Sequence, residues 1–145
     1  MKRRTERMHK VFLLAETDEK QQCRAMGTSQ RNLDNELDRL AELKAYRQSY
    51  GEQCRERQYN SMQWKDYQNF LQRLDQAVAI QTQVVMDGKM KRDAHRSRWM
   101  TKRRKVESLE RVVDRFRLKD AESDERTQQK SADELSANRR PFRDA

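Results

Sequence analysis

A seven-residue repeat of apolar side chains in the second half of the chain limits its possible folds more than any other feature. Alternating steps of four and three residues from Tyr67 to Phe116 visit fifteen positions, and ten of these are apolar or aromatic. That share is about twice the one expected for a chain that is 34% hydrophobic. One long helix with a single buried seam accounts for the repeat. The positions are Tyr67, Leu71, Leu74, Val78, Gln81, Val85, Gly88, Arg92, His95, Trp99, Lys102, Val106, Leu109, Val113 and Phe116.

The composition favours a helical hairpin over a globular domain. The 145 residues include 39% charged side chains, three glycines and one proline. Such a chain cannot bury an ordinary core, whereas a helical hairpin needs only a narrow apolar stripe. We therefore predict an all-α fold, a long antiparallel two-helix coiled coil. No apolar stretch reaches the roughly 18 residues of a transmembrane helix, so we expect no membrane span.

The turn is predicted where seam residues are missing. Residues 55–62 contain no aliphatic seam residue, and Asn60 or Ser61 can cap the helix that follows. We expect a single hairpin domain over residues 1–145, with helix one at about 4–56, the turn at 57–61 and helix two at about 62–137. Past Phe116 the repeat gives way to polar residues, so the end of helix two should fray into a flexible polar tail at 138–145.

The turn also sets a register for the hairpin. Facing residue numbers should sum to about 117 in an antiparallel pair around this turn, which places Tyr50 near Tyr67 and Leu40 near Val78. Polar residues and a glycine replace seam hydrophobics around Gly88 and His95. We expect poor packing there.

Apolar residues just beside the seam suggest a protein interface. Phe70, Ala77 and Val84 each precede a seam residue by one, and a strip of such residues on one flank would be exposed. In helix one, three residues likewise precede the heptad positions of Lys44, Arg47 and Gly51; they are Leu43, Tyr46 and Tyr50. The alternative for these three is a register slip after Leu40 that makes them the seam itself. Leu74 and Gln81 would lie at the edge of the strip.

Positive charge is concentrated between Lys89 and Lys105, where nine of seventeen residues are Lys or Arg and only Asp93 is acidic. The whole chain carries a net charge of +9. Such a segment can be a solvated helix face or can bind nucleic acid, an anionic membrane or an acidic protein. Nucleic acid is disfavoured because Trp99 is the only aromatic residue among the cations, and it lies in the seam. The off-seam cations that we select as candidates are Arg96, Arg103 and Arg104, together with Arg3, Arg4 and Arg7 near the amino terminus.

No pattern in the sequence indicates catalysis or metal binding. His9 and His95 lie far apart, and neither has a cysteine or carboxylate at ligand spacing on its helical face. Cys23 and Cys54 would lie too far apart on one helix to form a disulfide, so we interpret them as free thiols of a cytosolic protein. We expect no enzymatic activity, no cofactor and no metal.

Three motifs together resemble the bacterial flagellar export protein FliJ family. They are Trp64-x-x-Tyr67-x-x-Phe70-Leu71-x-x-Leu74-x-x-Ala77, the earlier Leu43-x-x-Tyr46-x-x-x-Tyr50, and Arg98-Trp99 followed by the segment from Leu109 to Phe116. The likeness covers about residues 8–140. Each motif alone has low specificity, but their order and spacing in a chain of this length are much more telling.

The resemblance implies a non-enzymatic, stalk-like component of the flagellar type III export apparatus at the cytoplasmic face of the inner membrane. Family members bind the hexameric export ATPase ring, promote its assembly and activity, and link it to the membrane export gate, with export chaperones as further partners. The six candidate arginines named above would bind the ATPase ring. The residues that match gate-binding positions are Leu43, Tyr46, Tyr50, Phe70, Leu74, Ala77 and Gln81.

Two other functions remain open from the sequence. The first is the equivalent stalk protein of a virulence type III secretion system, which has the same architecture. The second is a basic coiled-coil tether for nucleic acid or a membrane surface.

Overall fold

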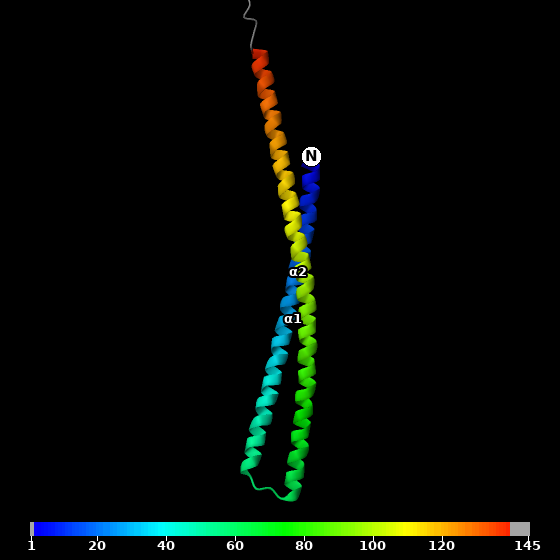
Figure 1. The fold of residues 1–145 in the computed structure, drawn as a ribbon, viewed down its shortest axis with the longest axis vertical. Coiled ribbons are helices and arrows are strands. Elements are labelled where there is room, and N and C mark those ends of the chain that lie inside the picture. The colour runs from blue at the N-terminus through cyan, green and yellow to red at the C-terminus, as the bar shows by residue number, and fades with distance from the viewer. Residues whose placement is uncertain (1, 140–145) are drawn as a thin grey trace, which may run out of the picture. The chain divides into compact units, whose positions relative to one another are not determined.

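Two helices make up almost all of the described chain. The structure is a computed structural model and describes residues 2–139. Helix α1 spans Lys2–Glu56 and helix α2 spans Ser61–Arg139, with no strand in that range. The helices are antiparallel and joined by residues 57–60 (Figure 1), so the predicted helical hairpin is confirmed. Residues 138 and 139 of the expected flexible tail belong to α2, and the rest of that tail lies outside the described residues.

Asn60 caps the amino terminus of α2. The backbone N–H of Gln63 donates to Asn60 Oδ1 at 2.8 Å, and the Asn60 N–H donates to Gln63 Oε1 at 3.2 Å. This reciprocal pair is a capping box, which satisfies two backbone donors that a helix start leaves without partners. The cap fixes where α2 begins, one residue before the start predicted from the sequence.

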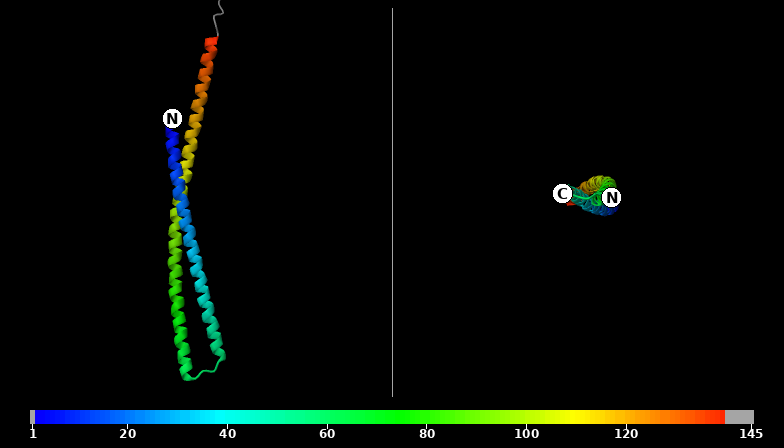
Figure 2. Two further views of the ribbon diagram at one scale, coloured as in Figure 1. Left: turned by 180° about the vertical axis from the view of Figure 1, so that it is seen from behind. Right: turned by 90° about the horizontal axis from the view of Figure 1, so that it is seen from below.

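The contacts within the hairpin divide it into two compact units. The hairpin unit is Gln21–Met100 and contains the loop. The terminal unit consists of the described residues up to Lys20 in α1 and from Thr101 in α2. In each unit a segment of α1 lies beside a segment of α2 (Figure 2). In the terminal unit, α2 continues past the start of α1, and all side chains from Asp124 to Asn138 are exposed.

A continuous heptad seam joins the two helices. Every position of the predicted α2 series from Tyr67 to Phe116 is buried or partly buried. The seam of α1 keeps one unbroken repeat, in which every position except Arg47 is at least partly buried. No register slip occurs after Leu40. The α1 positions are Thr5, Met8, Phe12, Ala15, Glu19, Gln22, Met26, Ser29, Leu33, Glu36, Leu40, Leu43, Arg47, Tyr50 and Cys54.

Packing around Gly88 is tighter than the sequence suggested. Leu33 is only 1% exposed and forms the core cluster with Leu40 and Val85, against which Val78 packs. A Cβ atom at Gly88 would stand 3.3 Å from Leu33 Cδ1. The expectation of poor packing was therefore wrong at Gly88, because the missing side chain makes room for Leu33 from the other helix. Farther along, His95 remains half-buried, and its Nδ1 atom is buried without a hydrogen-bond partner.

Replacement by alanine should stabilise the hairpin unit to different extents at Gly51 and at Gly88, because the space around these two glycines differs. A Cβ at Gly51 meets no atom within 4 Å. Gly51→Ala should therefore raise the free energy of unfolding by about 1 kcal/mol, the difference in helix propensity. Gly88→Ala should gain less, because its methyl group crowds Leu33. Thermal and urea unfolding of both variants would measure this difference. Equal increases in the free energy of unfolding would show that the Leu33 side chain shifts at no cost to make room for the methyl group.

Candidate partner-binding surfaces

Aromatic rings close the hairpin next to the loop. The Tyr50 ring centroid lies 4.5 Å from that of Phe70 and 5.5 Å from that of Tyr67. The predicted neighbourhood of Tyr50 and Tyr67 is thus confirmed. Trp64 and Tyr59 pack against the other side of the Tyr67 cluster, at ring distances of 5.4 and 6.0 Å from Tyr67. These rings replace the aliphatic side chains that form the core nearer the middle of the hairpin unit.

The structure separates the three aromatic and apolar candidates of α1. Leu43 and Tyr50 are partly buried members of the seam, because the unbroken repeat of α1 passes through them without the register slip that the alternative required. Tyr46 lies beside the seam and is 53% exposed. Its ring meets Phe70 edge-on at a centroid distance of 6.4 Å. Of the three, Tyr46 alone presents most of its side chain to a partner.

The candidates of α2 are also less exposed than predicted. Phe70 was expected to be exposed but is half-buried, because Tyr50 covers one face of its ring. Leu74 is buried in the seam, and Ala77 is half-buried. Gln81 is occupied within the hairpin, because its amide donates to the Glu36 carbonyl oxygen at 2.9 Å and to the Glu36 carboxylate.

Two exposed residues of α2 extend this surface, and the set of gate candidates did not include them. Ile80 is 67% exposed, and Val84 is also exposed. Ile80 follows Ala77 by three positions and precedes Val84 by four, so the three residues are neighbours on one helix surface. That spacing is visible in the sequence, but Ile80 lies farther from the seam than the residues that were considered. We call the resulting surface the flank strip; it consists of Tyr46, Phe70, Ala77, Ile80 and Val84.

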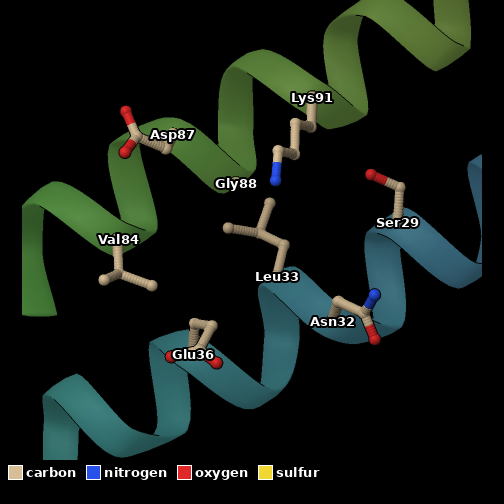
Figure 3. A pocket seen from close by; sticks show the side chains of 8 residues that line it. All are labelled: Ser29, Asn32, Leu33, Glu36, Val84, Asp87, Gly88 and Lys91. Carbon is tan, nitrogen blue, oxygen red and sulfur yellow. The ribbon is translucent and has the colours of Figure 1, made fainter.

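Two hollows open beside the flank strip. One, of about 380 Å³, is lined by Arg39, Glu42, Leu43, Tyr46 and Gln81. The other, of about 360 Å³, has Leu33 between the helices, with Val84 at its side and the Lys91 ammonium group above Leu33 (Figure 3). Its remaining lining consists of two neutral polar residues, Ser29 and Asn32, and two acidic ones, Glu36 and Asp87, with Gly88 in the wall. An apolar strip beside hollows that combine apolar and charged groups is suited to hold a peptide segment or helix of another protein.

The opposite flank carries an ion pair between the helices. Arg47 donates to the Asp75 carboxylate, and this hydrogen bond is the main cause that lowers the pKa of Asp75 and raises that of Arg47. Burial is the main cause that raises the pKa of the Tyr50 phenol, and a hydrogen bond with Cys54 raises that of Tyr59. Because their pKa values are raised, the phenols of Tyr50 and Tyr59 stay protonated and uncharged at neutral pH.

The arginine candidates lie in both units. Arg96 belongs to the hairpin unit and the other five to the terminal unit, and all six are exposed. The Arg4 guanidinium stands 4.7 Å from the Phe116 ring centroid, and Arg103 lies 3.8 Å from Glu19 and 3.6 Å from Glu107. Arg4 and Arg103 thus already have partners within the hairpin. Arg3, Arg7 and Arg104 are the candidates whose removal is least expected to disturb it.

Polar contacts also join the two helices of the terminal unit. Thr5 Oγ1 donates to Asp120 at 2.6 Å, and Lys2 Nζ lies 3.6 Å from Asp124. Farther along, Lys102 lies 3.9 Å from Asp18. Acidic residues of both helices therefore neutralise part of the basic segment near its carboxy-terminal end.

Within residues 2–139, no group of His, Cys, Asp and Glu side chains is arranged to hold a metal ion. Cys54 is buried with its Sγ 3.3 Å from the Tyr59 hydroxyl, whereas Cys23 is exposed, and both are free thiols. Neither described helix contains a stretch that is long and apolar enough to cross a membrane.

Comparison with models of known protein families gives one match, to the family described as "Flagellar FliJ protein", over residues 4–143. No curated protein and no solved structure matches the chain. The family match covers both helices and the loop between them, so it includes the flank strip and the basic segment.

The Arg47–Asp75 pair should make the stability of the hairpin depend on pH. The pKa of Asp75 is lowered in the folded chain, so its contribution is present above the unfolded value of about 3.9 and is lost as the pH falls through the lower folded value. Asp75→Asn should lower the melting temperature at pH 7, by a small amount because the pair is half-exposed. The difference from the unmodified chain should vanish only once the pH has fallen below the folded pKa of Asp75, which itself lies below the unfolded value. The exposed Asp38, changed to Asn, serves as the control, and a difference that persists in acid would contradict this account.

Proposed function

Since the chain belongs to the flagellar FliJ protein family, and so to the flagellar type III export machinery, we propose that it is a stalk-like component without enzymatic activity. In this proposal it binds the hexameric export ATPase, promotes ring assembly and ATP turnover, and links the ring to the membrane export gate. Escort of export chaperones is a further role that the family suggests.

The flank strip carries the proposal for gate binding. It places exposed apolar side chains next to one another on one flank of the hairpin, beside two hollows with polar groups. Exposed apolar patches of this kind mark protein interfaces, in which a few well-placed side chains supply most of the binding energy. Tyr46 and Ile80 are the members with the largest exposed area, and Tyr46 keeps its orientation through its edge contact with Phe70.

The terminal unit supports the proposal for the ATPase ring. Arg3, Arg7 and Arg104 are exposed there, and they lie on different turns of two paired helices. Exposed arginines on a narrow helical pair can meet acidic residues that line the bore of a ring, and arginine forms two parallel hydrogen bonds with a carboxylate. Such contacts would steer the stalk into the ring and weaken at high ionic strength.

Mixing the purified chain with its cognate export ATPase tests the first half of the proposal. ATP turnover should rise, and light scattering after size exclusion should show a hexamer that carries one stalk. The triple variant Arg3→Gln/Arg7→Gln/Arg104→Gln should reduce stimulation roughly tenfold at low salt. A matched variant, Arg55→Gln/Lys65→Gln/Arg73→Gln, removes the same charge from the hairpin unit and should stimulate normally. Absence of binding and of stimulation by the unmodified chain would refute the ATPase role.

Binding to the cytoplasmic region of the cognate gate protein tests the flank strip. Tyr46→Ala and Ile80→Ser should each raise the dissociation constant roughly tenfold, because each removes an exposed side chain from the contact. Leu14→Ser is the matched control, since Leu14 is 69% exposed but lies in the terminal unit. Thermal unfolding should change little in Ile80→Ser and Leu14→Ser, and only slightly more in Tyr46→Ala, which also loses the edge contact with Phe70. Equal loss of binding in the control would show that the strip has no special role.

A further inference from the structure

The outer face of α2 between Met86 and Met100 combines exposed methionines with cations on both sides. Met90 is 72% exposed, and Met86 and Met100 are exposed as well. With Ala94 and Ser97, which are also exposed, the methionines lie on the side of α2 that faces away from the seam. We propose that this face binds an anionic phospholipid surface. The inference is independent of the proposed roles with the ATPase and the gate.

The positions of the cations support contact with lipid. Met90 lies opposite the seam; Lys89 precedes it and Lys91 follows it, so their side chains are turned about 100° to either side. Seven residues later, at the equivalent heptad position, Arg96 and Arg98 flank Ser97 in the same way. Long cationic side chains at the edges of an apolar face can extend to lipid phosphates, while the face itself enters the headgroup region.

Acidic residues do little to weaken this arrangement. Across from Gly88–Met100, the segment of α1 from about Gln21 to Leu33 contains no Asp or Glu, and Asp34 is the first acidic residue beyond it. On α2, Asp93 lies within the face, but the Arg92 guanidinium stands 3.1 Å from its carboxylate. Asp87 at the near end accepts a hydrogen bond from the Gln83 amide at 3.0 Å. Lys91 shares a hollow with Asp87 and Glu36, so Lys89, Arg96 and Arg98 are the flanking cations best placed to meet external phosphates.

The methionines favour a lipid surface over other polyanions. Nucleic acid and acidic protein loops would be bound by the cations alone, and nothing in such binding requires three exposed thioether side chains. A lipid interface uses both features, since burial of apolar side chains and attraction of cations to anionic headgroups add to each other. Methionine is flexible enough to fill an irregular headgroup layer.

Sedimentation with lipid vesicles tests the proposal. The unmodified chain should bind vesicles that contain phosphatidylglycerol, should not bind pure phosphatidylcholine vesicles, and should dissociate as the salt concentration rises. Lys89→Gln/Arg98→Gln removes one cation from each side and should lower the partition coefficient roughly tenfold. Met86→Ser/Met90→Ser leaves the charge unchanged and should lower it to a similar extent.

Arg24→Gln/Arg31→Gln provides the matched control. It also removes two charges, but from the outer face of α1, which lies about two helix diameters from the methionine face. That distance of roughly 20 Å exceeds the Debye length of about 10 Å at 0.1 M salt, so lipid binding should hardly change.

Three results would overturn the proposal. The first is absence of binding to the anionic vesicles. The second is equal loss in both charge variants with no effect of the methionine variant, which would indicate attraction by net charge. The third is tighter binding to duplex DNA than to the vesicles, with the same insensitivity to the methionines. All substituted side chains are exposed, and unchanged circular dichroism melting curves would confirm that each variant is folded.

Discussion

Contact along a single stripe holds α1 and α2 together, and in the described structure neither helix has another neighbour to pack against. The stripe is apolar over much of α2, but α1 contributes polar residues such as Glu19 and Glu36. These residues find partners across the seam in Arg103 and Gln81. Polar residues at seam positions, such as Glu19 and Glu36, add less stability than apolar ones, but they penalise other registers, in which they would face apolar residues. The apolar residues thus supply most of the adhesion and the polar pairs select the alignment.

The candidate gate-binding surface consists of apolar side chains of the hairpin unit that are not buried in the seam. Because the α1 repeat passes through Leu43 and Tyr50, these two residues are used in holding the hairpin together. The apolar side chains that remain exposed are Tyr46, one residue before the seam position Arg47, and those of the flank strip on α2. Phe70 belongs to both regions, since it packs against Tyr50 and supports the ring of Tyr46. A substitution of Phe70 would therefore affect stability and binding together.

The sequence was sufficient to predict the hairpin, the region of the turn and every seam position of α2 from Tyr67 to Phe116, because apolar residues there keep the heptad period. It was insufficient to predict the seam positions of α1, because polar residues such as Glu36 and Arg47 occupy some of them and the heptad period of apolar residues is interrupted there. The exposure of Phe70 was wrongly predicted for this reason. Gly88 shows another limit of sequence analysis: a missing side chain is visible in the sequence, but the residue that fills the space, Leu33, comes from the other helix.

Since each helix has one neighbour, most side chains on every turn remain in contact with water. Substitutions at such positions usually change the free energy of unfolding by no more than about 0.5 kcal/mol, so folding places little constraint on them. Over evolutionary time the outer faces can diverge almost freely, while the heptad period and a few contact residues persist. Ancestry in a hairpin of this kind is therefore recorded in the spacing of its residues more durably than in their identity.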